Sequence, residues 1–399
     1  MAKRRANGEG SIYQRKDGKW CSQYIDCFGA KKYFYGKTQQ EVKKKLQEAI
    51  RQSNDGIALN PRKITVSAWV KEWLDTFQRP VIRESTYSYN LTRWRTHIEP
   101  YFSHIQLKDL RTEHVQRFLN EKATKRKDGR NGGYSTTTVS LLYSALRCSL
   151  EKAVELGYIP KNPANGVQIR AQETEKKRIL SLSEQQAFEK CVKGDFAQWY
   201  NSSIFLLMLY TGMRVGEALG LQLSDVDLSK REIKVCRTVG SIDNTEGKGK
   251  RLYISAPKTK AGQRVIPLSE TAAELLAAQI DKRNETVEQM RPIWQERGKT
   301  LVFVDAGYIY LTDGGRLIDH PNLVRKLKQL CKKAGIEYVT PHALRHSFAT
   351  RWIEAGLDVR TFSDILGHRD VRMTLNIYTH ALPEQKRKNM DALDAWLKR

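Results

Sequence analysis

Tyr378 is a candidate nucleophile, because a phenol oxygen can attack phosphorus and form a covalent phosphotyrosine link. Its ordinary pKa of about 10 makes the phenol a poor nucleophile by itself. Arginines near it would stabilise both the phenolate and a pentacoordinate phosphorane. Because a tyrosine in a stretch like residues 373–380 is more often a packing residue, this chemistry requires partners elsewhere in the chain.

Arg214 lies in the string TGMRVGEAL, just after an apolar run over residues 204–210. The run predicts a helix that ends at Gly212, with a new helix beginning near Arg214. Amide dipoles at a helix start favour an anion, and Glu217, one turn further on, would hold the guanidinium in place. A lone arginine at such a position usually forms a surface salt bridge, so its role depends on the other motifs.

His342 and Arg345 lie in the string TPHALRH, in which Thr340 is a good N-cap and Pro341 suits the first helical position. The two donors fall three residues apart on one helical face, an arrangement that can face a phosphate. His342 and His346 also have the spacing of a zinc-binding pair. The string lacks the glutamate of H-E-x-x-H, and no third ligand is indicated, so no metal is expected.

Two lysines and a second histidine are further candidates for hydrogen bonding and proton transfer. Lys258 and Lys260 lie between the strand-like segments 251–256 and 264–268, for which we predict a hairpin. A lysine on such a turn can reach a leaving oxygen and donate a proton to it. His368 follows a Leu-Gly pair, where the glycine is expected to end the preceding helix and expose the histidine.

The charge of the chain indicates a polyanionic partner. The 399 residues include 69 Lys plus Arg against 44 Asp plus Glu, a formal net charge of +25. The basic residues recur along the whole length, which favours nucleic acid over a simple solubility feature. Six scattered cysteines include no C-x-x-C pair, which argues against a disulfide framework. The longest apolar run is too short to span a bilayer and no signal peptide is evident, so a cytoplasmic protein is expected.

Three domains are predicted to carry these residues. Residues 1–60 read as a small β-sheet plus helix, with a hairpin turn at Asp17-Gly18 and a capping box opening the Lys-rich helix. Residues 61–168 read as all-α, with a basic, glycine-containing loop. After a charged linker, residues 175–399 read as a mixed α+β domain, mainly helical with a small antiparallel sheet. A second capping box, at residues 181–184, marks its first helix.

The order R…K…HxxR…H…Y across these strings resembles the tyrosine recombinases of the phage-integrase family. The resemblance covers the whole last domain, and its motifs, weak singly, are specific in this order. TGMRxxE, PKTxxGxRxIPL, HxLRH, LGH and YTH look like strings of phage and conjugative-transposon integrases. The N-terminal sheet looks like an arm-binding domain and the helical middle looks like a core-binding domain. This layout favours an integrase over the shorter chromosome-resolution recombinases.

The resemblance implies that Arg214 and Arg345 grip the non-bridging oxygens of a scissile DNA phosphate, with Glu217 in support. His342 and His368 would hydrogen-bond the same phosphate and assist proton movement. The implied activity is that of a site-specific DNA recombinase that integrates and excises a mobile element.

In the implied reaction, Tyr378 attacks phosphorus to give a 3′-phosphotyrosyl link and a free 5′-hydroxyl. Lys258, favoured by its place in P-K-T, would protonate the leaving oxygen, with Lys260 as the alternative. The covalent intermediate keeps the phosphodiester energy, so neither ATP, a metal ion nor another cofactor would be required. The 5′-hydroxyl of a partner duplex would then rejoin the strands.

The implied partners are double-stranded DNA, at core and arm-type sites of element ends and target, and further copies of the chain in a homo-tetramer. An accessory DNA-bending or excision factor is a further candidate, and no membrane is involved. The segment 382–399 has helical spacing and would dock on a neighbouring protomer or on its own domain. The expected place of action is the bacterial cytoplasm or nucleoid. Two rival interpretations are a type IB topoisomerase and a non-catalytic DNA-binding protein of the same fold.

Overall fold

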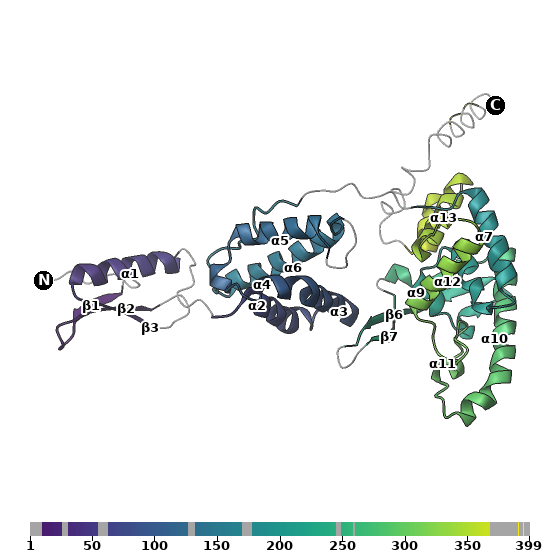
Figure 1. Ribbon diagram of the computed structural model, residues 1–399, viewed down its shortest axis with the longest axis horizontal. Helices are drawn as coiled ribbons and strands as arrows, with labels where there is room; N and C mark the ends of the chain where they lie inside the picture. The colour runs from purple at the N-terminus through teal and green to yellow at the C-terminus, as the bar shows by residue number, and fades with distance from the viewer. Residues whose placement is uncertain are drawn as a thin grey trace. The chain divides into compact units, whose positions relative to one another are not determined.

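The computed structural model divides the chain into two compact units, residues 1–175 and 176–399 (Figure 1). The described parts are mainly helical, with small antiparallel sheets. No helix among them is long and apolar enough to cross a bilayer. The described residues are 10–25, 31–54, 63–126, 132–169, 178–244, 249–257, 260–367, 390 and 394, without the side chains of residues 51–54, 260 and 359.

The first unit begins with a three-stranded antiparallel sheet, and Figure 1 shows a helix lying along one of its faces. Ile12, Tyr24 and Phe34 alternate with outward-facing residues and pack with Leu46 of the helix. The predicted strands, turn and helix are confirmed, with Gly18 at a positive φ of 79° in the turn. These elements are β1 (Ser11–Gln14), β2 (Trp20–Ile25), β3 (Lys31–Gly36) and α1 (Gln39–Asn54).

Helices make up the rest of the described first unit, as the apolar periodicity predicts. Trp69 Nε1 donates to the backbone oxygen of Ser149 at 2.9 Å and so joins two of them. The hydrophobic core of these helices is separate from the small core between the sheet and α1. The division of the chain into three domains stays a prediction. The helices are α2 (Val66–Trp73), which continues as a π-helical turn (Leu74–Gln78), α3 (Glu84–Arg93), followed by a second such turn (Trp94–Ile98), α4 (Glu99–Phe102), α5 (Thr112–Thr124) and α6 (Thr136–Glu155).

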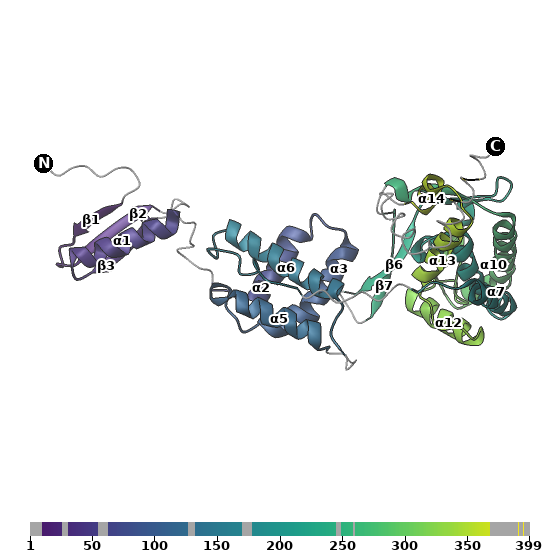
Figure 2. The same ribbon diagram turned by 90° about the horizontal axis from the view of Figure 1, so that it is seen from above.

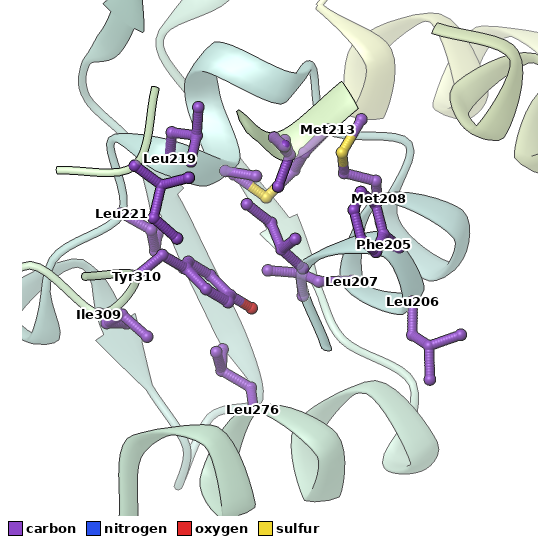
Figure 3. Close-up of a cluster of buried hydrophobic side chains, with 14 of the residues drawn as sticks. Phe205, Leu206, Leu207, Met208, Met213, Leu219, Leu221, Leu276, Ile309 and Tyr310 are labelled. Carbon is purple, nitrogen blue, oxygen red and sulfur yellow. The ribbon is translucent and has the colours of Figure 1, made fainter. Parts of the chain in front are cut away.

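The second unit is organised around α8 (Ser203–Thr211), a mainly apolar helix in which every residue except the partly exposed Tyr210 is buried. Figure 3 shows side chains of α8 gathered with others from Met213, Leu219, Leu276 and Tyr310. Helices α10 (Glu270–Glu296) and α13 (Pro341–Glu354) pack against α8. The remaining helices are α7 (Leu182–Asp195), α9 (Val215–Leu219), α11 (Val302–Asp305), α12 (His320–Lys333) and α14 (Val359–Leu366).

The capping box predicted at the start of this unit is confirmed. Ser181 Oγ accepts from the backbone N–H of Glu184 at 3.2 Å, and Glu184 Oε2 accepts from the backbone N–H of Ser181 at 2.9 Å. These two reciprocal bonds satisfy donors that would otherwise be unpaired at the start of α7.

The strands predicted over residues 251–256 and 264–268 are present, but the hairpin predicted to join them is wrong. β7 (Lys250–Ser255) pairs with β6 (Thr238–Asp243), and both project from the helices in Figures 1 and 2. β8 (Arg264–Pro267) pairs instead with β5 (Glu232–Val235), whose other neighbour is β4 (Val226–Asp227). The hairpin turn lies where Asn244 N donates to Gly249 O at 2.9 Å. Strand propensity identifies such segments, whereas the choice of partner depends on packing.

Gly212 ends α8 in the left-handed region, with φ 66° and ψ 14°. A Cβ atom added there would lie 2.5 Å from Phe348 Cδ1 and 2.7 Å from Leu366 Cδ2. Both the backbone conformation and the lack of space therefore require glycine at this position. The close approach brings the end of α8 against α13 and α14.

Replacing Gly212 by alanine should lower the free energy of unfolding by about 2–4 kcal/mol, because left-handed strain and overpacking add. Gly335 is a matched control, since its φ is 70° and an added Cβ meets nothing within 4 Å. Gly335→Ala should lower the free energy of unfolding by only about 1 kcal/mol, because it introduces left-handed strain without overpacking. Urea unfolding of the full chain measures both. Equal losses in the two variants would contradict the tight packing at Gly212.

Candidate active site

A buried carboxylate, Glu217, lies at the centre of the site, near the start of α9. Its side chain is 4% exposed and receives hydrogen bonds at both oxygens. Arg214 donates its backbone N–H to Oε2 at 2.9 Å and its Nη1 to Oε1 at 2.8 Å. Arg264, on β8, donates Nη2 to Oε2 at 2.9 Å and Nη1 to Oε1 at 3.2 Å. One carboxylate thus holds two guanidinium groups. The sequence predicts this contact for Arg214 but not for Arg264.

Arg345 approaches the same cluster from α13 and is only 3% exposed. Its Nη1 donates to the backbone oxygen of Gly212 at 2.7 Å, and its Nη2 donates to that of Leu366 at 2.8 Å. These acceptors lie at the C-terminal ends of α8 and α14, where helix dipoles place partial negative charge. The arginine therefore ties three helices together while keeping its charge at their junction.

The charges of this cluster act on one another. Burial alone would raise the pKa of Glu217, but hydrogen bonds from Arg264 and the charges of Arg264 and Arg214 hold it below its usual value. Burial, followed by the nearby charge of Arg214, lowers the pKa of Arg345 to about 9. The lowering reflects the cost of a cation in a dry, positive surrounding, a cost that a bound anion would offset. Arg214 is 40% exposed and can meet such an anion.

His342 occupies the second position of α13, which Thr340 and Pro341 begin as predicted. Thr340 Oγ1 accepts from the backbone N–H of Ala343 at 3.2 Å. The His342 side chain is exposed, and its ring stands edge-on to that of His346, with centroids 4.5 Å apart. One helix thus carries His342 at its accessible start and Arg345 in its buried part.

The structure brings together Arg214, Glu217 and Arg345, and it places His342 on the helix that carries Arg345. α14 ends at Gly367 in the left-handed conformation, as predicted, and the chain leads from there to His368. Three candidates lie outside the described residues: Lys258, His368 and Tyr378. The backbone of Lys260 begins a short 3-10 turn (Lys260–Gly262), and its side chain is not described. Among the described residues, no group of three His, Cys, Asp or Glu side chains could hold a metal.

Arg264 is the site residue that sequence reasoning missed. It lies in the PKTxxGxRxIPL string, in which only the lysine is predicted to have a role, as a proton donor. Its partner Glu217 lies 47 positions earlier in the chain. Strand alternation gave one usable indication, because Ile266, two residues on, belongs to the buried face of the same strand.

The sequence profile described as "Phage integrase family" matches residues 172–385, more than half of the chain. The chain belongs to the phage integrase family. A second match, to "Phage integrase, N-terminal SAM-like domain", covers residues 65–123, within the helical part of the first unit.

Relatives of this family member extend over nearly its whole length. A protein described as "Tyrosine recombinase XerC-like", from Caldanaerobacter subterraneus subsp. tengcongensis, is 29% identical over 378 residues, with 91% of each chain covered. The transposase from transposon Tn1545 of Streptococcus pneumoniae is 27% identical over 427 residues, with 98% of each covered. The resemblance to tyrosine recombinases is therefore confirmed.

Solved structures share the integrase fold. The Tn1549 transposon integrase, in complex with a circular intermediate DNA, superimposes with a TM-score of 0.67 at 23% identity, covering 83% of this chain and 99% of that one. A lambda integrase tetramer bound to a Holliday junction gives a TM-score of 0.54 at 16% identity, covering 94% and 96%. The predicted multidomain, mainly helical architecture with small antiparallel sheets is confirmed.

Replacing Glu217 by glutamine should lower the free energy of unfolding by about 3–5 kcal/mol at pH 7, because Arg264 would remain buried without its counter-charge. The folded pKa of Glu217 lies below the ordinary 4.5, so its stabilisation is complete above pH 4.5 and declines as the pH falls through the folded value. The deficit of the variant should therefore shrink between pH 7 and about pH 3.5.

Urea titrations of the full chain at the two pH values measure this deficit. Glu274→Gln is the control, because Glu274 is an exposed glutamate on α10. It should show no deficit at either pH. A Glu217→Gln deficit that stays constant as the pH falls would mean that the carboxylate charge contributes nothing.

Proposed function

We propose that this chain is a site-specific DNA recombinase that cuts and rejoins strands through a 3′-phosphotyrosine intermediate, integrating and excising a mobile element. The observation that carries the proposal is the arrangement around Glu217. One buried carboxylate holds Arg214 and Arg264 beside the buried Arg345. The surplus of positive charge, with Arg214 partly exposed, suits a phosphate that approaches from solvent.

In this proposal Arg214 and Arg345 bind the non-bridging oxygens of the scissile phosphate. Planar guanidinium groups match these oxygens in geometry, and they stabilise charge that develops as phosphorus becomes pentacoordinate. Glu217 holds the guanidinium of Arg214 by accepting a hydrogen bond from its Nη1, and it also accepts from the backbone N–H of that residue. His342, exposed at the start of α13, hydrogen-bonds the phosphate, and His368 does so from the chain beyond α14.

Tyr378 supplies the phenol oxygen that bonds to phosphorus while the bond to the 5′-oxygen breaks. Lys258, or Lys260 in its place, transfers a proton to that leaving oxygen. The reverse reaction with the 5′-hydroxyl of a partner duplex rejoins the strands and restores the tyrosine. The phosphotyrosyl link conserves the energy of the diester, so the step consumes no ATP, and no metal takes part.

Double-stranded DNA is the proposed partner, bound at core and arm-type sites. The net charge of +25 supports this proposal, as do the DNA complexes in the Tn1549 integrase and lambda integrase structures. The tetramer of lambda integrase supports a homo-tetramer on DNA. An accessory DNA-bending or excision factor that sets direction, and a place of action in the bacterial cytoplasm or nucleoid, complete the proposal.

The function is tested by covalent capture. Sheared DNA from the encoding genome is incubated with the full chain, and fragments that stay protein-linked after denaturation are sequenced. The wild-type chain should trap one recombination site through a 3′-linkage. Tyr378→Phe should reduce trapping by at least about 10⁴-fold, because the nucleophile is gone. An undiminished adduct in Tyr378→Phe would remove Tyr378 as the nucleophile, and the absence of any wild-type adduct would contradict the proposed activity.

The outer face of the N-terminal sheet is the proposed surface for arm-type DNA. Tyr13, Tyr33 and Tyr35 share this face, opposite α1, and are 43%, 46% and 49% exposed. Arg15 lies over the ring of Tyr35 at 5.5 Å. Exposed aromatic rings beside basic side chains can contact both bases and phosphates.

The double variant Tyr33→Ala with Tyr35→Ala should weaken binding to arm-type DNA by about 10-fold or more, since each good base contact contributes roughly 1–3 kcal/mol. Fluorescence anisotropy at fixed salt measures the binding. Lys44→Ala is the control, because Lys44 is exposed on α1, across the sheet from these rings. Equal effects of the two variants would mean that the outer face does not read arm-type DNA.

A further inference from the structure

Arg264 joins three separate segments with a single side chain that is 6% exposed. Two of its nitrogens bind Glu217 in a bidentate pair. Its Nε donates to the backbone oxygen of Ile365, one residue before the end of α14. Its Nη1 also donates at 3.2 Å to the backbone oxygen of Gly262, in the turn that precedes β8. The planar guanidinium is thus shared among α9, α14 and the β7–β8 connection.

The β7–β8 connection is pressed against the end of α14. Gly367 has φ 64°, and a Cβ atom added to it would lie 2.7 Å from the backbone oxygen of Ala261 and 3.1 Å from Arg264 Cδ. No side chain fits between these segments. The turn therefore has a defined place, set by backbone contact at Gly367 and by the hydrogen bonds of Arg264.

Both candidate proton donors lie in this connection. Lys260 precedes Gly262 by two positions and Lys258 by four. Because an extended chain advances at most about 3.6 Å per residue, Lys260 stays within about 7 Å of Gly262 and Lys258 within about 14 Å. Whatever fixes Gly262 therefore limits where a lysine of the connection can present its ammonium group.

We propose that Arg264 is a positioning residue for protonation of the leaving 5′-oxygen, an inference that rests on the proposed recombinase function. In the cleavage step the bond from the Tyr378 oxygen to phosphorus forms and the bond to the 5′-oxygen breaks. The phenol proton leaves to a base or to solvent, and the 5′-oxygen takes a proton from the lysine ammonium. Arg264 touches none of these atoms. It acts by holding the β7–β8 connection, which carries the lysine, at a fixed position relative to the arginines around Glu217.

Two other roles would give different results. If Arg264 served only to hold Glu217 and Arg214, its loss would weaken the grip on the phosphate, whatever group leaves. If it served only the fold, its loss would lower the active fraction equally for every substrate. Only a positioning role in proton transfer makes the defect depend on the leaving group.

The experiment changes that group. The trapped recombination site is synthesised as a nicked duplex with either oxygen or sulfur at the bridging 5′ position of the scissile phosphate. A thiol, with a pKa of about 8.5, leaves without prior protonation. Arg264→Lys should slow adduct formation about 10–100-fold on the oxygen DNA. General-acid catalysis contributes about 10²–10⁴-fold, and the variant would move the proton-donating lysine rather than remove it. On the sulfur DNA the loss should fall below about threefold.

The ratio of the two rates is measured on one preparation, so a partly folded variant does not distort it. Arg264→Gln, which cannot bind the three acceptors together, should show the same dependence on the leaving group. Arg283→Lys is the matched control, because this buried arginine donates to the backbone oxygens of Tyr308 and Val304, away from the cluster. Any loss in Arg283→Lys should be equal on both DNAs.

Equal losses on oxygen and sulfur DNA in both Arg264 variants, or no loss on either, would overturn the positioning role while leaving the proposed function intact. Failure of the wild-type chain to form an adduct with either DNA would instead contradict the proposed function itself.

Discussion

The second unit depends on a buried carboxylate with more than one counter-charge. A buried carboxylate is costly unless hydrogen bonds and opposite charges compensate for the lost water. Glu217 meets this condition by accepting from Arg214 and Arg264 at both of its oxygens. The condition also ties α9 to β8, because the same carboxylate accepts from Arg214 before α9 and from Arg264 at the start of β8. The fold and the candidate site therefore rest on the same contacts.

Helix ends, rather than helix faces, provide the other contacts of the site. Gly212 and Gly367 both adopt left-handed conformations that end α8 and α14 and leave carbonyl oxygens directed at the cluster. Arg345 donates to two such oxygens, which carry partial rather than full negative charge. The cluster therefore keeps its excess of positive charge. A second acidic partner would have stabilised the unit in the absence of ligand and weakened its attraction for a phosphate.

The sequence predicts those features that depend on neighbours along the chain. The capping box of Ser181 and the end of α8 at Gly212 both follow from local pattern, and the structure confirms them. Strand pairing was wrong because β7 and β8, adjacent in sequence, belong to different sheets. Arg264 was missed for the same reason. Its three acceptors lie on segments that only the folded chain brings together, and residue type alone does not identify them.

The charge of the cluster favours one stage of the proposed reaction over another. The cluster contains three guanidinium groups and one carboxylate, so these four side chains have a formal charge of +2. A phosphodiester brings one negative charge, and the phosphorane formed by phenolate attack brings two. In the proposed reaction the charge of the cluster thus matches the transition state better than the substrate, which is the condition for catalysis rather than tight binding. Burial is the largest cause of the lowered pKa of Arg345, and the neighbouring charge of Arg214 lowers that pKa further, so a bound anion would favour the charged form. The order of the motifs predicts which residues take part, and this balance of charge gives a physical reason for three arginines near a single acid.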